Sequence, residues 1–394
     1  MRILFICHRF PFPPNRGGKI RPFHMIEHLS RRHTVVVGSL AHSEKELHAG
    51  AQLKEHCAGI IAEVLPNRVR WARAIAALPS STPSSVAYFW SSRLARRIRE
   101  AWKTGSFDGV IVHCAFVARY ALELRGGFRL LDFGDLDSGK WLDYSRFRRP
   151  PLSFGYGLEA RKLRRYERRM ATEFGRCTVT TEGEREEFQS LNVPVRCTVI
   201  PNGVDAAYFE PSLKRSERPP VIVFLGRMDY FPNIDAVSNF AKRAFPLIRK
   251  NLPHAELRVI GSDPVKSVRQ LAQIPGITVT GFVPDVRPYL EDAAVAIAPL
   301  RIARGTQNKI LECMAAGVPV VASPEAAKGI QAIPGRHLLV AKNVDEFVDK
   351  VTNILQHKDL HDELSKDARR QVETAHDWQS SMQLLDGVLA EWKK

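Results

Sequence analysis

The chain has 394 residues, enough for two domains, and its 44% hydrophobic and 25% charged residues are ordinary for a soluble globular protein. No run approaches the length of a transmembrane helix, and the short apolar start before Arg9 predicts a buried strand in place of a signal peptide. Six scattered cysteines without a Cys-x-x-Cys pair predict reduced thiols, a cytoplasmic protein and no metal site.

The formal net charge of +16 is concentrated in the first half of the chain. Residues 1–200 carry 33 Lys and Arg against 19 Asp and Glu, whereas residues 201–394 carry 25 against 23. A basic half is expected to meet an anionic membrane surface, a phosphate-bearing acceptor or nucleic acid. No helix-turn-helix, zinc-finger or RNP signature is present, so nucleic acid is the weakest of the three.

The chain opens with a predicted β–loop–α–β unit whose strands are residues 3–7 and 34–40. The proline-rich loop after the first strand ends in the pair Gly17-Gly18, which lets backbone approach a ligand closely. Open α/β sheets bind ligands at this edge. Lys19 and Arg21 follow at once, and they favour a phosphate or acceptor contact over a plain turn.

Three basic segments follow, at residues 68–78, 93–102 and 161–169, the last within a predicted helix over 158–174. Arginines on one face and Trp, Ile or Leu on the other are typical of a helix that lies on a membrane. The alternative is that the apolar faces pack on the sheet and the arginines are only solvated.

Candidate acid/base groups follow two further strands. His113 ends one of them, and Asp132, Asp135 and Asp137 follow the next, which ends at Leu131. Active sites collect at the carboxyl ends of buried strands. Three carboxylates in six residues favour hydroxyl binding or acid/base chemistry, although one of them would also serve as a helix cap.

The polar, proline-rich stretch 210–220 is the expected domain linker. A second series of strands and helices starts with the strand 221–225. Arg227 follows that strand directly, where a guanidinium can bind a diphosphate through two parallel hydrogen bonds.

A loop, a helix and a buried strand are predicted over residues 305–323. The loop ends at Asn308, and the free amides at the start of the helix form an anion site. Lys309 opposes the helix dipole, so its presence asks for a bound anion. Glu312 lies one turn further on about the same face, where it could hold ribose hydroxyls. The alternative is a solvated Lys309 that pairs with Glu312.

In this order the sequence resembles glycosyltransferase family 4, over nearly the whole chain. The resemblance rests on Pro201-Asn-Gly-Val-Asp205 with Phe209, the Gly226-Arg227 loop, Thr280-Gly-Phe-Val-Pro284, and the block from Lys309 through Glu312 to Pro319-Val-Val321. Three further stretches resemble the exosortase (PEP-CTERM)-associated sugar transferases of exopolysaccharide loci: residues 8–21, the loop 132–137 and Met228-Asp-Tyr-x-Pro-Asn233.

The resemblance implies the α/β GT-B fold, in which two Rossmann-like, doubly wound domains face a central cleft. We expect an acceptor-binding domain over residues 1–205 and a nucleotide-sugar-binding domain over 206–375. A C-terminal helix at about 376–394 is expected to pack back on the first domain.

The resemblance also implies roles for individual residues. Arg227 and Lys309 would stabilise the leaving diphosphate, and Glu312 would hold the ribose. The remaining donor-binding residues fall into three groups. Gly17 and Gly18 would close over the phosphates, and the loop of Phe282 and Val283 would hold the nucleobase. The backbone at the helix start would bind the diphosphate through Gly305, Thr306, Gln307 and Asn308. No metal or other cofactor is expected, and UDP- or GDP-sugars are the expected donors.

Three departures from the family pattern affect these roles. Arg304 replaces a usual Glu, so the sugar cannot be deduced, and Pro232 replaces a usual basic residue. A usual His on the acceptor side aligns with Asp135, which we therefore place among the catalytic residues. Asp132 and Asp137 are alternatives for its role, and His113 is a weaker one. Lys19 and Arg21 complete the acceptor side.

The sequence therefore predicts a cytoplasmic hexosyltransferase, peripheral on the inner face of the plasma membrane. It would move a sugar from a nucleotide-diphosphate sugar to a lipid-linked saccharide or exopolysaccharide precursor, without metal and with retention of configuration. The alternatives are a non-catalytic GT-B scaffold of a polysaccharide assembly complex and a GT-B sugar-nucleotide epimerase.

Overall fold

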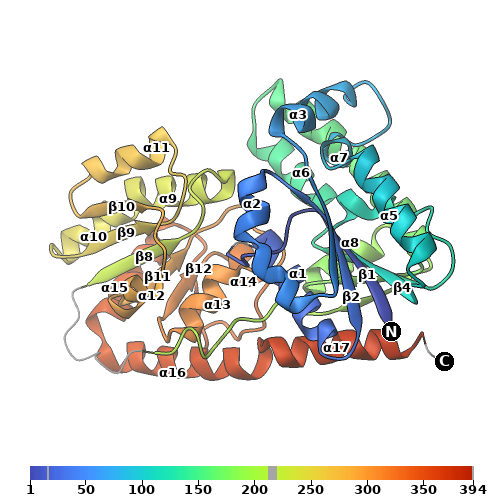
Figure 1. The fold of residues 1–394 in the computed structure, drawn as a ribbon. Helices are drawn as coiled ribbons and strands as arrows, with labels where there is room; N and C mark the ends of the chain where they lie inside the picture. Colours follow the sequence, from blue (N-terminus) through green and yellow to red (C-terminus); the bar gives the residue numbers. More distant parts are fainter. Residues whose placement is uncertain (16, 212–219, 393–394) are drawn as a thin grey trace. The chain divides into compact units, whose positions relative to one another are not determined.

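The computed structural model describes residues 1–15, 17–211 and 220–392, and the chain divides into two compact α/β units (Figure 1). The N-terminal unit comprises Met1–Ile200 and the chain from Met382 onward, and the C-terminal unit comprises Pro201–Ser381. The linker expected at 210–220 lies largely outside the described residues. None of the helices described is both long and apolar enough to cross a membrane.

The N-terminal unit is built on a seven-stranded parallel sheet with the order β3-β2-β1-β4-β5-β6-β7. Its strands are β1 (Arg2–Cys7), β2 (Thr34–Ala41), β3 (Gly59–Val64), β4 (Gly109–His113), β5 (Phe128–Gly134), β6 (Arg176–Val179) and β7 (Arg196–Val199). Its helices are α1 (Gly17–Ser30), α2 (Glu44–Ala49), α3 (Asn67–Ala76), α4 (Ser84–Tyr88), α5 (Ser92–Thr104), α6 (Asp137–Phe147), α7 (Leu152–Phe174) and α8 (Glu182–Gln189).

The central strands are apolar throughout because helices cover both faces of a parallel sheet. Ile3–Ile6 of β1 and Val110–Val112 of β4 are fully buried. Cys7 pairs with His113 at the ends of these strands, so the chain after β1 and the end of β4 lie at the same edge of the sheet.

Helix α1 begins earlier than the sequence suggests. The pair Gly17-Gly18, Lys19 and Arg21 all lie within its first turns, not in a loop, and Lys19 and Arg21 are buried. Carboxylates from other elements neutralise both charges, which allows the helix to bury its basic start.

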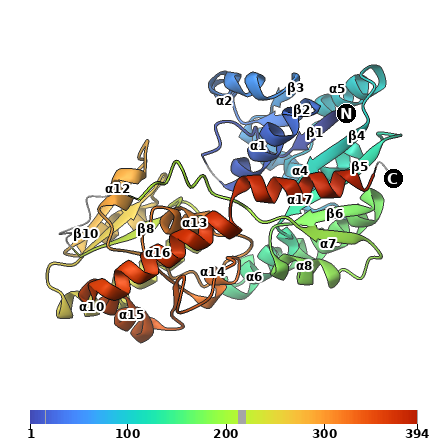
Figure 2. The same ribbon diagram turned by 90° about the horizontal axis from the view of Figure 1, so that it is seen from below.

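The last helix, α17 (Trp378–Ala390), belongs to the N-terminal unit from Met382 onward, and this part lies at the edge where β5, β6 and β7 begin (Figure 2). Asp386 of this helix accepts from His28 of α1, at 3.0 Å. Glu391, just beyond it, forms ion pairs with Arg176 and Arg196, the first residues of β6 and β7.

The C-terminal unit is built on a six-stranded parallel sheet with the order β10-β9-β8-β11-β12-β13. Its strands are β8 (Val221–Leu225), β9 (Glu256–Ile260), β10 (Ile277–Gly281), β11 (Val295–Ala298), β12 (Val320–Ala322) and β13 (Leu339–Val340). Its helices are α9 (Phe231–Arg243), α10 (Phe245–Asn251), α11 (Lys266–Arg269), α12 (Arg287–Glu291), α13 (Asn308–Ala315), α14 (Pro324–Ala327), α15 (Val344–Gln356) and α16 (Lys358–Ala375).

Strand β8 is fully apolar and buried, as a central parallel strand requires. Residues before it also belong to this unit: Phe209 packs in its core, and Val204 bridges to Asp377. The chain therefore enters the C-terminal unit at Pro201, before the expected linker.

Candidate functional site

Each sheet has a point at which the strand order reverses direction. In the N-terminal unit it lies between β1 and β4, and in the C-terminal unit between β8 and β11. Loops diverge on either side of such a point and leave a crevice at the carboxyl ends of the strands, where α/β proteins bind ligands. The residues that follow these four strands are therefore the first candidates for a site.

Lys309 lies at the reversal point of the C-terminal unit, in the first turn of α13. Its Nζ donates to Asn233 Oδ1 at 2.6 Å and lies 4.7 Å from the ring centre of Phe224. The side chain also lines a small cavity, whose other lining residues belong to β8, β11, β12 and α13 and are aliphatic apart from Cys313. Lys309 is therefore a cation in apolar surroundings whose hydrogen-bond partner is a neutral amide.

Burial shifts the pKa values of Lys309 and Glu312 toward one another. It lowers the pKa of Lys309 to about 8, against a smaller opposing effect of Glu312. It raises the pKa of Glu312 to about 7, against the opposing effect of Lys309. Both groups therefore titrate near neutral pH, where an anion bound at Lys309 would favour the charged lysine.

The start of α13 has unsatisfied polar groups. No side chain caps its first turn. Thr306 Oγ1 and Asn308 Oδ1 are buried and find no hydrogen-bond partner among the residues that the structure describes. Gln307 instead donates to Arg304 O at 3.0 Å. Buried polar atoms without partners are rare in proteins, and here they lie beside an uncapped helix start that favours anions.

Gly226 and Arg227 approach Lys309 from the end of β8. A Cβ on Gly226, whose φ is +154°, would lie 2.6 Å from Asn233 Nδ2 and 3.1 Å from Lys309 Nζ, so this position requires glycine. Asn233 Nδ2 donates to Arg227 O at 2.9 Å. The two elements are thus joined through Asn233, which was not among the predicted site residues.

The guanidinium of Arg227 is held by carboxylates. It ion-pairs with Asp229, with Nε at 3.0 Å from Oδ1, and with Asp263 at 3.3 Å. The side chain is 39% exposed, so these pairs are partly screened by water. A diphosphate would bind Arg227 in exchange for one of these partners.

Phe282 and Val283 follow β10 at the same edge of the sheet. Phe282 is 73% exposed, whereas Val283 packs against the core. An exposed ring at a strand end is available for stacking on a flat ligand.

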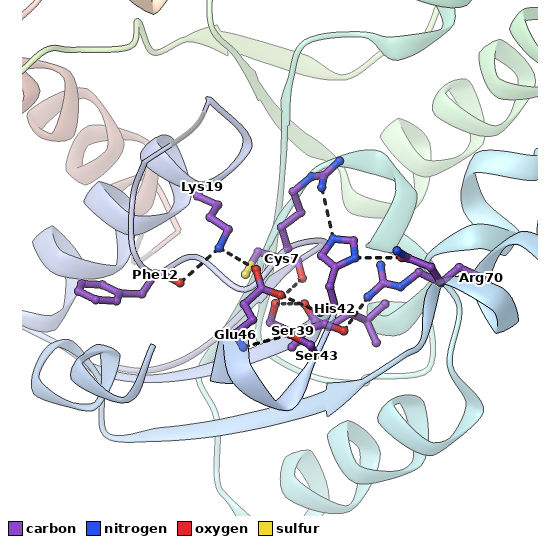
Figure 3. A network of polar contacts seen from close by, with 12 residues as sticks. Cys7, Phe12, Lys19, Ser39, His42, Ser43, Glu46 and Arg70 are labelled. Atoms are coloured by element: carbon purple, nitrogen blue, oxygen red, sulfur yellow. Dashed lines mark hydrogen bonds and ion pairs between the residues drawn. The ribbon is translucent and has the colours of Figure 1, made fainter. Parts of the chain in front are cut away.

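In the N-terminal unit, Lys19 already has a carboxylate partner. Its Nζ lies 2.7 Å from Glu46 Oε1 and donates to Phe12 O at 3.3 Å, within the polar network of Figure 3. Gly17 is exposed with no atom close to its Cβ position, and Gly18 packs against Arg9 and His8. Lys19 therefore serves to hold α1 against α2.

Arg21 and Asp132 form a buried ion pair. Asp132 is fully buried and accepts from Arg21 Nε at 2.9 Å and Nη2 at 2.7 Å, and from Thr178 Oγ1 at 2.7 Å. Burial alone would raise the pKa of Asp132, but Arg21 and the hydrogen bond from His113 outweigh it and hold the pKa far below its usual range. Asp132 is thus ionised near neutral pH.

The remaining contact of Asp132 orients His113. Asp132 Oδ2 lies 2.7 Å from His113 Nδ1, which leaves the ring's Nε2 without a hydrogen bond from the described residues. The ring of His8 stands 5.7 Å away, centre to centre. A Cβ on Gly134 would meet His113 Cε1 at 3.5 Å, so the imidazole covers the end of β5. An imidazole oriented by a carboxylate is a common acid/base arrangement.

The other two candidate carboxylates serve local structure. Thr180 Oγ1 donates to Asp135 Oδ1 at 2.8 Å, and burial raises the pKa of Asp135. Asp137 is the first residue of α6 and forms an ion pair with Lys140. His8, next to His113 at the reversal point, belongs to the 8–21 motif but was not among the predicted site residues; its place directly after β1 is the sequence signal that brings it here. No cluster of His, Cys, Asp or Glu suited to a metal ion occurs among the described residues.

Two family models match the sequence. Residues 16–208 match the model of Glycosyltransferase Family 4, and residues 219–357 match that of Glycosyl transferases group 1. The protein is a glycosyltransferase of the family 4 type. A comparison with curated protein sequences finds no match.

The fold is shared with solved glycosyltransferase structures. Sucrose-phosphate synthase from Thermosynechococcus elongatus superposes with a TM-score of 0.71 at 16% identity, covering 99% of this chain and 98% of its own. Anabaena HepE, solved in complex with UDP, superposes with a TM-score of 0.69 at 14% sequence identity. The match covers 99% of this chain and 100% of HepE. WaaG, a glycosyltransferase involved in lipopolysaccharide biosynthesis, superposes with a TM-score of 0.65 at 15% sequence identity, and the match covers 98% of each chain. The predicted GT-B class of two parallel-sheet Rossmann-like domains is confirmed.

The Arg21–Asp132 pair generates a stability prediction. Arg21→Met or Asp132→Asn leaves a buried charge without its partner, and we expect each to lower the free energy of unfolding by about 3–5 kcal/mol in denaturant titrations. Arg31→Met, an exposed arginine just after α1, should change it by less than about 0.5 kcal/mol. An Arg21→Met variant as stable as the wild type would instead support the role of an acceptor-binding side chain.

Proposed function

We propose that the protein transfers a sugar from a nucleotide-diphosphate sugar to a lipid-linked saccharide or exopolysaccharide precursor, on the cytoplasmic face of the plasma membrane. The observation that carries the donor side is Lys309, a cation in apolar surroundings beside the uncapped start of α13. HepE, which has the same fold, was solved with UDP and with UDP-glucose, and this supports a nucleotide-sugar donor. The exosortase-associated subtype and the acceptor rest on the sequence resemblance.

In this proposal the bond between the sugar C1 and the diphosphate oxygen breaks while C1 bonds to an acceptor hydroxyl, whose proton passes to Nε2 of His113. Negative charge grows on the leaving diphosphate, and Lys309, Arg227 and the first amides of α13 stabilise it without a metal ion. Thr306 and Asn308 donate or accept hydrogen bonds at the same place. Glu312 accepts from the ribose hydroxyls, and Phe282 stacks on the base.

For the acceptor side we propose His113 in place of Asp135. Its Nδ1 is held by an ionised, buried Asp132, so Nε2 is presented to a substrate hydroxyl with a fixed direction. Asp135 already accepts from Thr180, and Lys19 and Arg21 are neutralised within the fold. Retention of configuration and independence of metal ions are also part of the proposal, and they rest on the sequence resemblance alone.

Donor binding is tested by thermal shift with UDP-, GDP-, ADP- and dTDP-sugars. One nucleotide class should stabilise the wild type, by about 2.7 kcal/mol at a concentration 100-fold above Kd. Lys309→Ala should abolish the shift, whereas Lys242→Ala, an exposed lysine of α9, should retain it. The absence of a shift with every nucleotide, or an equal shift in Lys309→Ala, would contradict the donor site.

The affinity for the nucleotide should depend on pH in a bell shape. Above the pKa of Lys309, about 8, the diphosphate loses its cation, and below the pKa of Glu312, about 7, the carboxyl is protonated and holds the ribose less well. On each side of the maximum, the association constant for the nucleotide should fall by up to about tenfold per pH unit in calorimetric titrations. Lys309→Met should flatten the alkaline limb and Glu312→Gln the acid limb; an unchanged profile in both variants would refute this assignment.

His113 and Asp135 are separated by kinetics. His113→Ala should slow the rate at which free nucleotide is produced from the nucleotide-sugar that stabilises the wild type, by about 100-fold or more. The thermal shift with that nucleotide-sugar should be unchanged, because the residue acts in the reaction and not in donor binding. Asp135→Asn preserves the hydrogen bond from Thr180 and should remain near wild-type rate. The reverse pattern would return the catalytic role to Asp135.

A further inference from the structure

Helix α3 buries its polar side and exposes its apolar side. Arg70 is fully buried, with Nε donating to Leu65 O at 2.7 Å and Nη2 to Ala41 O at 2.8 Å. Trp71 and Ile75 are each 61% exposed, and Leu78, just beyond the helix, is 53% exposed. These three residues are spaced i, i+4 and i+7, so they share one face. An arginine thus occupies the place of a core residue, and an apolar stripe faces outward.

Helix α7 carries a second exposed stripe. Phe154 is 76% and Leu158 is 47% exposed, and Arg161 and Arg165 continue the same face toward the C-terminal end of the helix. Leu152 is 56% exposed at the start of α7. The stripe is therefore apolar at one end and basic at the other.

The two stripes belong to one part of the surface. Lys162 of α7 donates from Nζ to Leu78 O at 2.7 Å and to Ala77 O at 3.3 Å, at the end of α3. Glu159 of α7 accepts from the amides of Ser84 and Ser85 of α4 at 2.9 and 2.8 Å. Helices α3 and α7 accordingly lie together in Figure 1. We call the exposed set the apolar face: Trp71, Ile75, Leu78, Leu152, Phe154 and Leu158.

Basic side chains predominate around the apolar face. No Asp or Glu occurs between Glu63 and Glu100, or between Asp143 and Glu159. Exposed arginines of α3, α6 and α7 and of the chain between them include Arg68, Arg146, Arg149, Arg161 and Arg165, of which Arg146 forms an ion pair with Asp143 at 3.6 Å. A second copy of this basic surface would be repelled, whereas an anionic bilayer attracts each arginine near its surface.

We propose that the apolar face inserts into the interface of an anionic lipid bilayer, with the arginines at the lipid head groups. Large apolar side chains surrounded by basic ones fit the boundary between head groups and acyl chains. Helix α5, also basic and amphipathic in sequence, is not part of this surface because Leu94, Ala95 and Ile98 pack in the core. The inference rests on the proposed function only in that a lipid-linked acceptor gives membrane binding a purpose.

The test is flotation of the full-length protein with vesicles that contain phosphatidylglycerol, compared with vesicles of phosphatidylcholine alone. The wild type should float with the anionic vesicles at low salt, and its partition coefficient should fall at least tenfold in the double variant Trp71→Ser/Phe154→Ser. Leu247→Ser, an equally apolar but 44% exposed residue of α10, is the matched control and should bind as the wild type does.

Three results would overturn the proposal: no flotation of the wild type with anionic vesicles at low salt, equal flotation of the double variant, or a lipid-free dimer in light scattering that the double variant dissociates. The thermal shift with nucleotide-sugar, measured without vesicles, is independent of this surface. A double variant that loses flotation but keeps the shift separates the two proposals, and a wild type that floats without any nucleotide shift refutes only the donor site.

Discussion

The organisation of both units depends on how a positive charge is accommodated where parallel strands end. In the N-terminal unit, Arg21 is buried and fully neutralised by Asp132, and this pair also fixes Thr178 and His113. In the C-terminal unit, Lys309 has the neutral amide of Asn233 as its hydrogen-bond partner, and no carboxylate within ion-pair distance among the described residues. A half-buried cation in apolar surroundings gains from a bound anion, so the first arrangement is complete and the second favours a ligand.

This difference assigns separate tasks to the two sheets. The Arg21–Asp132 ion pair of the N-terminal unit stabilises the fold, and Asp132 also fixes the orientation of the His113 imidazole. The C-terminal unit instead keeps a lysine and a glutamic acid with pKa values near neutrality, beside an uncapped helix start. In the proposed reaction the incoming diphosphate supplies the missing negative charge, which couples donor binding to the protonation of Lys309.

The sequence predicted the parts of this arrangement that depend on local patterns. Apolar runs such as Val221–Leu225, and the Gly305–Asn308 loop before α13, identify strands and a helix start by themselves. Partners distant in sequence were not predictable: Asp132 lies 111 residues from Arg21, and Asn233 lies 76 from Lys309. From the sequence we therefore placed Lys19 and Arg21 on the acceptor side and Asp135 ahead of His113, without knowledge of these partners. The exposure of the apolar side of α3 was also not predictable, because periodicity identifies an apolar stripe but not the side of the helix on which the core lies.

The most direct test of the account is a crystal structure of the protein with UDP. We predict that the diphosphate oxygens replace Asn233 as the partner of Lys309 Nζ and accept from the first amides of α13, with Glu312 on the ribose. UDP bound elsewhere, or bound while Lys309 still donates to Asn233 and makes no contact with phosphate, would contradict it.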